Sequence, residues 1–455
     1  MKISRTCALA VCLLVASAAP MPLIAQTYTD LYNFDSTHGA YPEYPSLLAQ
    51  GRDGNLYGTT SEGGTSGVGV VFKIAPLGTL AVLYSFDHVH GSYPFGGLTL
   101  GADGNFYGTT LQGGGLGCGG VGCGTVFKIA PSGKLTTIHT FTDGAAGDNP
   151  YPPPIQAING NVYGTAGDAV YRITPLGSFT QLGTISGGSY APLLQATDGN
   201  FYGTETDGGS FGEGAVFEMT RDGAVRVLYS FNGTEGSTPY APVIEATDSN
   251  FYGTTISGGD YGGGTAFKLT PQGAVTVLHS FPDPDYLNDG LEPTSGLVQG
   301  TDGNFYGVAG GGGDNAGISF KITSAGVYSI INYFNSVTGA NPSSNLIQHT
   351  DGDIYGETVL GGTANLGVLC SIDLGLAPFA SLVGTWGKVG QAQGVLGQGL
   401  TGTNGVFFNG VPATFKVVSD TYLTAIVPQG ANTGFVTITT PNGDLKSNTK
   451  FVVNP

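Results

Sequence analysis

The chain has 455 residues, including 79 Gly and 25 Pro, while charged residues make up only 10% of it. Its hydrophobic content of 40% and aromatic content of 11% exclude a disordered chain, and the low charge content argues against solvated helices linked by ion pairs. The formal net charge of −17 repels phosphate groups, so we expect no nucleic-acid partner, and an all-β protein with many tight turns remains.

The first 25 residues have the layout of a secretory signal peptide. Lys2 and Arg5 precede an apolar run over residues 8–15, and small residues offer cleavage points after Ala18 or Ala25. No later stretch approaches the ~18 apolar residues of a membrane span. We expect residues 1–25 to be removed and the mature protein to be secreted, periplasmic or held at the cell surface.

One motif recurs seven times between residues 27 and 376. Its first copy, DGNLYGT, occupies residues 53–59, and its tyrosine recurs at positions 107, 163, 202, 252, 306 and 355. A period of about 50 residues is typical of propeller blades. The repeat therefore predicts a β-propeller with seven blades.

Each repeat resolves into four short strands. In the first, residues 46–50 lead through the turn Asp53-Gly54-Asn55 to a strand at 56–60. A Gly-rich loop, a strand at 70–74, a Pro-Leu-Gly turn and a strand at 80–86 follow. Gly and Asn tolerate the positive φ of hairpin turns, and Pro presets φ. Four antiparallel strands repeated radially form a propeller.

The outermost strand indicates how the ring closes. Versions of its Leu-Tyr-Ser-Phe sequence occur seven times, but the first copy, at residues 31–34, precedes every Asp-Gly-Asn turn. The seventh repeat, which ends near residue 374, has no such strand after it. The N-terminal strand is thus predicted to complete the seventh blade, which removes the free sheet edge.

Two cysteines lie in the Gly-rich loop of the second repeat. Cys118 and Cys123 are five positions apart, and in an exported protein we expect them to form a local disulfide. A metal site is not expected because two further ligands are lacking nearby. Cys370 falls in a strand pattern and is predicted to be a buried free thiol.

Residues 380–455 break the period. Segments at 406–415, 418–428 and 434–443 alternate apolar and polar residues between turn signals, as strands of a sandwich do. We expect a separate β-sandwich domain.

These residues carry two resemblances. The repeated DGNFYGT, VFKITPxG and LYSF sequences resemble the bacterial choice-of-anchor tandem repeat GloVer-containing proteins over about residues 28–375. That resemblance implies secretion and a surface anchor, but no activity. The repeats depart from it at Asn159-Gly160, Ser249 and Asp353. Residues 380–455 resemble an IPT/TIG domain, an immunoglobulin-like module that acts as a spacer or binding unit.

Aromatic residues supply the candidate ligand-binding site. The strand order places the Gly-rich loops and the connections between blades on one variable rim, where function is usually found. A Gly-x-x-Pro motif recurs in these connections, with tyrosine in it or beside it at Tyr41, Tyr93, Tyr151, Tyr190 and Tyr240. Tyrosines in this pattern suit stacking against sugars or peptides; alternatively they wedge adjacent blades together.

Other polar residues point to no chemistry. The Asp-Gly-Asn repeats offer too few oxygen ligands for calcium, and the acidic loop 283–292 fits no ligand template. His38, His88 and His90 lie on the variable rim without an evident carboxylate partner. We therefore assign no catalytic residue, metal ligand or cofactor.

The sequence favours an exported, non-catalytic binding or adhesion-type protein that recognises carbohydrate or protein through the variable rim. The alternative is an extracellular propeller enzyme, a polysaccharide lyase or hydrolase. The Asp-Gly-Asn-Leu-Tyr hairpins are also similar to those of antibiotic-cleaving lyase propellers, and acidic rim residues such as Asp148 and Asp285 could supply a carboxylate pair.

Overall fold

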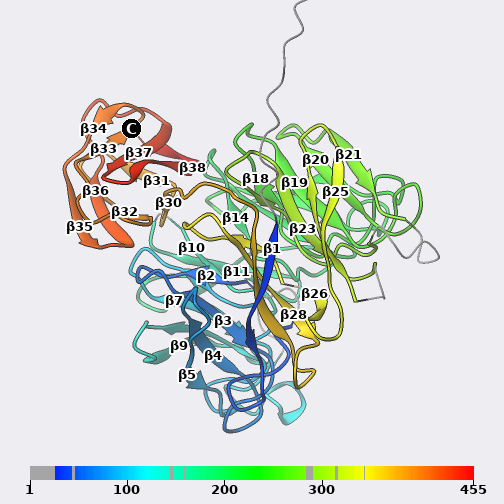
Figure 1. Ribbon diagram of the computed structural model, residues 1–455. Helices are drawn as coiled ribbons and strands as arrows, with labels where there is room; N and C mark the ends of the chain where they lie inside the picture. Colours follow the sequence, from blue (N-terminus) through cyan, green and yellow to red (C-terminus); the bar gives the residue numbers. More distant parts are fainter. Residues whose placement is uncertain are drawn as a thin grey trace, which may run out of the picture.

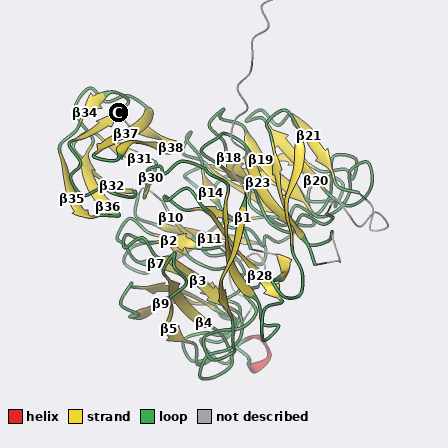
Figure 2. Cartoon of the chain, viewed as in Figure 1, coloured by secondary structure: helices red, strands yellow, loops and turns green. Residues whose placement is uncertain are grey.

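The computed structural model describes residues 26–43, 47–143, 147–157, 159–282, 290–312, 316–342 and 344–454. The predicted signal peptide and Asp285 lie outside these residues. The described chain is all-β, apart from one short 3-10 turn, η1 (Cys118–Gly120) (Figure 2). This part of the chain contains no helix with the length and apolar character that a membrane crossing requires.

Six four-stranded antiparallel sheets follow one another along the repeats, each with its strands in chain order. The first sheet contains β2 (Ala49–Gln50), β3 (Leu56–Thr60), β4 (Val70–Ile74) and β5 (Leu80–Ser85). The second contains β6 (Thr99–Leu100), β7 (Phe106–Thr110), β8 (Thr125–Ile129) and β9 (Leu135–Thr140). The third contains β10 (Ile155–Gln156), β11 (Val162–Ala166), β12 (Ala169–Ile173) and β13 (Phe179–Thr184).

The next three sheets repeat this pattern. The fourth contains β14 (Leu194–Gln195), β15 (Phe201–Glu205), β16 (Ala215–Met219) and β17 (Val225–Ser230). The fifth contains β18 (Ile244–Glu245), β19 (Phe251–Thr255), β20 (Thr265–Leu269) and β21 (Val275–Ser280). The sixth contains β22 (Val298–Gln299), β23 (Phe305–Ala309), β24 (Ile318–Ile322) and β25 (Tyr328–Tyr333). The first strand of each sheet has two residues, so the strand predicted at 46–50 is shorter than expected.

The seventh sheet joins the two ends of the repeat region. It contains β26 (Ala340–Pro342), β27 (Ile347–Gln348), β28 (Ile354–Leu360), β29 (Val368–Asp373) and the N-terminal strand β1 (Thr27–Asn33). β1 runs antiparallel to β29, with Thr27 opposite Asp373 and Asn33 opposite Val368 (Figure 1). The pairing of the first strand with the last repeat, which the position of the Leu-Tyr-Ser-Phe copies predicts, is therefore present.

One hydrogen bond recurs at the Asp-Gly-Asn turns. In six repeats the hydroxyl of the motif tyrosine donates to the turn Asp carboxylate, at 2.8–3.0 Å. In the third repeat Asn159 replaces Asp, and its Nδ2 donates to the Tyr163 hydroxyl at 2.9 Å. These tyrosines are buried, so each turn is tied to the core of its own sheet.

The same tyrosines connect neighbouring sheets. At four junctions the ring packs against the phenylalanine that precedes the motif tyrosine of the next sheet. At the other three junctions this position holds Leu56, Val162 or Ile354, which shares a buried cluster with the tyrosine. The ring centroids lie 4.0–4.4 Å apart in the pairs Tyr57–Phe106, Tyr163–Phe201, Tyr202–Phe251 and Tyr252–Phe305. Such pairs add about 0.5–1.5 kcal/mol beyond the burial of their area. One residue type thus holds both the turn and the contact between sheets.

The C-terminal unit has two sheets around one core. The first contains β30 (Ser381–Leu382), β32 (Ala392–Leu396), β36 (Tyr422–Ile426) and β35 (Phe415–Ser419). The second contains β31 (Trp386–Lys388), β38 (Gly443–Asn454), β37 (Gly434–Thr440), β33 (Gly405–Phe408) and β34 (Val411–Pro412). Val395 and Leu423 of one sheet share a buried cluster with Phe408, Ile438 and Phe451 of the other.

The C-terminal unit packs on the side of the repeat sheets that carries the Asp-Gly-Asn turns. The Arg52 guanidinium lies over the Tyr422 ring, and that of Arg221 lies over the Trp386 ring, each 4.7 Å from the ring centroid. The indole Nε1 of Trp386 donates to the Ala196 carbonyl at 3.2 Å. These contacts fix the unit against the first and fourth sheets.

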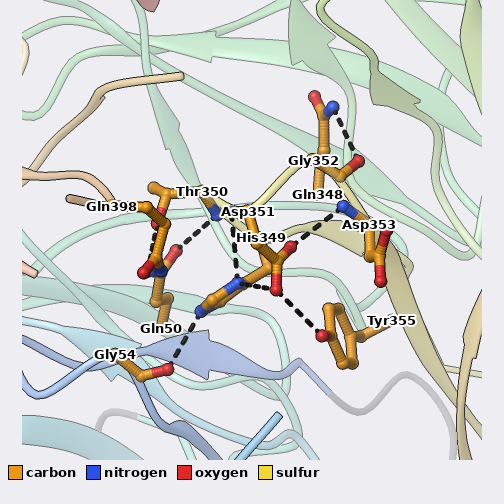
Figure 3. Close-up of polar contacts among 10 residues, drawn as sticks. All are labelled: Gln50, Gly54, Gln348, His349, Thr350, Asp351, Gly352, Asp353, Tyr355 and Gln398. Atoms are coloured by element: carbon orange, nitrogen blue, oxygen red, sulfur yellow. Dashed lines mark hydrogen bonds and ion pairs between the residues drawn. The ribbon is translucent and has the colours of Figure 1, made fainter. Parts of the chain in front are cut away.

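A buried histidine joins the seventh repeat to the first (Figure 3). His349 is fully buried, with Nδ1 2.8 Å from Asp351 Oδ2 and Nε2 3.0 Å from the Gly54 carbonyl oxygen. Beside it, Gln50 Nε2 and Gln398 Nε2 both donate to Thr350 Oγ1, at 2.7 and 3.1 Å. The last repeat, the first repeat and the C-terminal unit therefore meet in one polar network.

The turn Asp of the fifth repeat predicts a pH effect on stability. Burial raises the pKa of Asp248, but hydrogen bonds from Lys268, Asn250 and Tyr252 outweigh this and lower it from 3.8 to about 2. Its ionised form therefore stabilises the fold above pH ~4, and this stabilisation is lost as the pH falls towards 2. We expect the difference in Tm between the wild type and Asp248→Asn to shrink over that interval. A constant difference would contradict the assignment.

The buried contacts of His349 predict that replacing this residue destabilises the fold. His349→Leu leaves the Asp351 carboxylate and the Gly54 carbonyl without this partner, so we expect the free energy of unfolding to fall by about 1–3 kcal/mol in chemical denaturation. His139→Tyr is the control, because the equivalent positions of other sheets hold Tyr84 and Tyr229. An equal loss in both variants would show that the network at His349 has no special role.

Candidate functional site

The strand order divides the connecting segments of the repeat region between two rims. The short turns between the first and second strands, and between the third and fourth, form the turn rim. The other rim, here called the loop rim, contains the described parts of the loops and of the connections between sheets. The loops are 61–69, 111–124, 167–168, 206–214, 256–264, 310–312 with 316–317, and 361–367. The connections are 34–43 with 47–48, 86–98, 141–143 with 147–154, 185–193, 231–243, 281–282 with 290–297, and 334–342 with 344–346. The C-terminal unit packs at the turn rim.

A strained residue precedes the motif proline in six of the seven connections. The residue before the proline of the Gly-x-x-Pro motif has a positive φ, for example 53° at Tyr41, 58° at Tyr93 and 52° at Asn341. For non-glycine residues this costs of order 1–3 kcal/mol. Its N–H donates to a carbonyl of the preceding loop, as from Tyr93 to Val68 at 2.9 Å and from Thr238 to Glu213 at 2.8 Å. The strained conformation recurs in the repeats together with this hydrogen bond. The bond ties the connection to the loop of the preceding sheet.

The residues next to these prolines form an aromatic cluster. Phe95, Tyr151 and Tyr240 directly follow the motif proline, and Tyr190 precedes Ala-Pro as Tyr240 does. Their ring centroids form a chain: Phe95 to Tyr151 is 5.8 Å, Tyr151 to Tyr190 is 4.7 Å and Tyr190 to Tyr240 is 4.4 Å. All four rings are partly exposed. Together with Glu43, which follows the proline of the first connection, we call them the aromatic mouth.

The phenol and carboxyl groups of the mouth interact electrostatically. Burial raises the pKa of Tyr240, and the charges of Tyr190, Tyr151 and Glu43 raise it further. The pKa of Tyr151 is raised in the same way by burial, Tyr190 and Glu43. Burial also raises the pKa of Glu43 itself, and the nearby charge of Glu62 adds to this. Four rings from successive connections thus share a partly desolvated space with one carboxyl group.

The five predicted tyrosines do not all lie together. Tyr151, Tyr190 and Tyr240 belong to the aromatic mouth. Tyr93 lines a surface pocket of about 590 Å³ with His88, Val89, Leu116 and Val121, and its ring lies 6.5 Å from that of Phe95. Tyr41 takes the strained position before the proline, as Tyr93 does.

Sequence reasoning missed Phe95 and Glu43. The signal that identifies them is the register of the motif, because both directly follow its proline, as Tyr151 and Tyr240 do. The sequence analysis considered only tyrosines, whereas the position after the motif proline also holds a phenylalanine and a glutamate.

The cysteines and histidines of the loop rim have local partners. Cys118 and Cys123 are joined by a disulfide, and the backbone N–H of Cys118 donates to the Asp143 carboxylate. His38 Nδ1 lies 2.8 Å from Asp35, and His90 Nδ1 lies 3.0 Å from Asp87. The absence of carboxylate partners inferred from the sequence is therefore wrong for these two histidines. In both turns the partner is the Asp three residues before the His, and the sequence analysis did not recognise that the turn places the two side chains together. Cys370 is a buried free thiol.

Solved structures of similar fold support this description. The chain is similar to a streptogramin B lyase structure, with 14% identity and a TM-score of 0.54, over 76% of this chain and 97% of that one. It is also similar to the extracellular domain of a hybrid two-component system protein from B. thetaiotaomicron, with 9% identity and a TM-score of 0.50, over 95% of this chain and 59% of that one. A search of curated proteins finds no match.

The fold and the mouth define an all-β repeat protein of propeller-like architecture with an aromatic surface at one rim. The model of the Gloeobacter/Verrucomicrobia repeat family matches residues 21–172 and 166–370, and the chain belongs to that family.

Proposed function

We propose that this chain is an exported binding protein that recognises carbohydrate through the aromatic mouth. In this proposal residues 1–25 are a signal peptide, residues 27–376 form a seven-bladed β-propeller, and residues 380–455 form an immunoglobulin-like IPT/TIG domain that acts as a spacer. The seven repeat sheets and the pairing of β1 with β29 support the propeller. The two sheets around a shared core support the immunoglobulin-like domain.

The observation that carries the proposal is the chain of four partly exposed rings from Phe95 to Tyr240. Four successive connections place these rings beside one another, with centroids 4.4–5.8 Å apart. Tyrosine combines a flat apolar face with a polar hydroxyl, which matches a pyranose ring with its apolar face and peripheral hydroxyl groups. The rings belong to connections held by repeated backbone hydrogen bonds, so binding would order few side chains.

A second candidate, an extracellular polysaccharide lyase or hydrolase, is favoured by Glu43 alone. A carboxyl group whose pKa is raised by burial and by a neighbouring acid can act as a general acid. It lies at the mouth, where a saccharide would bind. Such an enzyme would break a glycosidic bond. The glycan array described below can detect the released product.

Tyr190 is the residue to test, because its ring contacts both Tyr151 and Tyr240. We expect Tyr190→Ala to weaken saccharide binding about tenfold, equivalent to ~1.4 kcal/mol. Binding and released products are to be measured on a glycan array with the purified mature chain. Tyr261→Ala is the matched control, since Tyr261 is an exposed tyrosine of the loop rim outside the mouth.

Three other results would change the interpretation. Equal binding by both variants would remove the mouth from the proposal. Product release that is lost in Glu43→Gln would favour the enzyme. If no saccharide is retained, the carbohydrate proposal is wrong and a protein ligand becomes the better candidate.

A further inference from the structure

A pocket of about 560 Å³ lies between the turn rim and the C-terminal unit. Turns and inner strands of the repeat sheets line one side of it, and β31, β32 and β36 of the C-terminal unit line the other. Ligand pockets of about 300–1,000 Å³ occur preferentially at domain interfaces, where aromatic side chains and a few polar groups line them. This pocket, here called the interface pocket, has such a lining in Arg52, Asp103, Gln156, Trp386, Gln393 and Tyr422.

Two side chains of the C-terminal unit bring unpaired polar groups to the interface pocket. Gln393 and Tyr422 are each only 6% exposed. Gln393 Nε2 donates to the carbonyls of Gly384 and Gly394, but its Oε1 accepts no hydrogen bond from the described residues. The Tyr422 hydroxyl also has no hydrogen-bond partner among them. Since side chains this deeply buried normally pair their polar groups, the two favour a ligand with hydroxyl groups.

Arg52 gives the interface pocket a positive charge. Its half-buried guanidinium lies on the Tyr422 ring, and Nη2 donates to the Ala102 carbonyl at 2.7 Å. None of the ion pairs among the described residues includes Arg52. The acid of the lining, Asp103, is engaged in its own turn, where Oδ2 accepts from Asn105 at 2.7 Å and from the motif tyrosine at 3.0 Å. The guanidinium can therefore pair with a carboxylate of a ligand.

A smaller pocket of about 240 Å³ adjoins the interface pocket, since Gln195 and Gln391 line both. The described residues of its lining include Arg221 and Lys388 but no Asp or Glu. Neither cation belongs to an ion pair among the described residues. Together with Arg52, three cations thus line the two pockets of a chain whose formal net charge is −17. A local excess of positive charge attracts an anionic ligand.

We propose that the two pockets bind an oligosaccharide that carries carboxylate groups. This site goes beyond the proposed function, because it lies at the turn rim and not at the aromatic mouth. The carboxylates pair with Arg52, Arg221 and Lys388, and sugar hydroxyls pair with Gln393 and Tyr422. A hydroxyl group both donates and accepts, as each side-chain amide does, so the glutamines of the lining favour a sugar over a peptide.

Uronic acid trimers and their methyl esters test the charge requirement, because esterification removes the charge and keeps the sugar rings. The probes are galacturonate and mannuronate trimers, added to the purified mature chain at neutral pH. At low salt, we expect calorimetry to show at least one acid trimer binding about tenfold more tightly than its ester. That preference should shrink when the salt rises from ~0.01 M to ~0.1 M, which shortens the Debye length from ~30 Å to ~10 Å.

Variants assign the binding to these residues. Arg52→Gln is expected to weaken binding of the acid trimer about tenfold and to leave the weaker binding of the ester unchanged. Lys416→Gln is the matched control, because it makes the same change in net charge at an exposed site outside both pockets. Tyr422→Phe keeps the ring against Arg52 and removes only the hydroxyl, so it should weaken the acid trimer and the ester alike. If Arg52→Gln lowers the Tm, Tyr422→Phe carries the test.

The outcomes separate this site from the aromatic mouth. Binding that survives Tyr190→Ala and is weakened by Arg52→Gln and Tyr422→Phe supports the inference, whatever the mouth binds. If neither acid trimer binds, or if the esters bind equally well, the inference is wrong. Loss of binding in Tyr190→Ala would place the ligand at the mouth and would also overturn it. A glutamate trimer carries the charge without sugar hydroxyls, and equal binding of that peptide would replace the saccharide with an acidic peptide.

Discussion

The contact that the rest of the repeat region depends on is made by the motif tyrosine. Its hydroxyl holds the carboxylate of the turn in its own sheet, and its ring packs on the phenylalanine of the next sheet. The turn and the contact between sheets are therefore set by one buried side chain. The contact is with a phenylalanine at four junctions and with Leu56, Val162 or Ile354 at the other three, so an apolar residue takes this place at every junction.

This repeated geometry explains why the loop rim can carry side chains that the core does not need. The strained residue before each motif proline is held by a hydrogen bond to the preceding loop, so the connection keeps its course whatever residue follows. In four connections that following residue is an acid or an aromatic, namely Glu43, Phe95, Tyr151 and Tyr240, whereas the sixth has Thr294 there. A rigid scaffold with variable residues at one equivalent position is a common basis for a binding surface.

The two rims have different roles because their charges and neighbours differ. At the turn rim, Arg52 packs on Tyr422 and Arg221 packs on Trp386. Two of the chain's few basic residues therefore contact the C-terminal unit. The loop rim has acids, rings and Gly-rich segments, and it faces away from that unit. Among the described residues, the segments of the loop rim contain Asp and Glu but no Lys or Arg, so the charge of this rim has one sign.

The sequence by itself determined the all-β class, the four-stranded repeat unit and the pairing of the N-terminal strand with the last repeat, because periodicity and turn chemistry are local signals. It also indicated the connections in which to look for a site. Only the tertiary structure decided which residues meet. It separated Tyr93 from Tyr190, added Phe95 and Glu43, gave His38 and His90 their Asp partners, and joined Gln50 to Thr350 across 300 positions. The motif register marks the positions of Phe95 and Glu43, and the His–Asp pairs span three residues, whereas Gln50 and Thr350 are too distant in the chain for any local pattern to specify their contact.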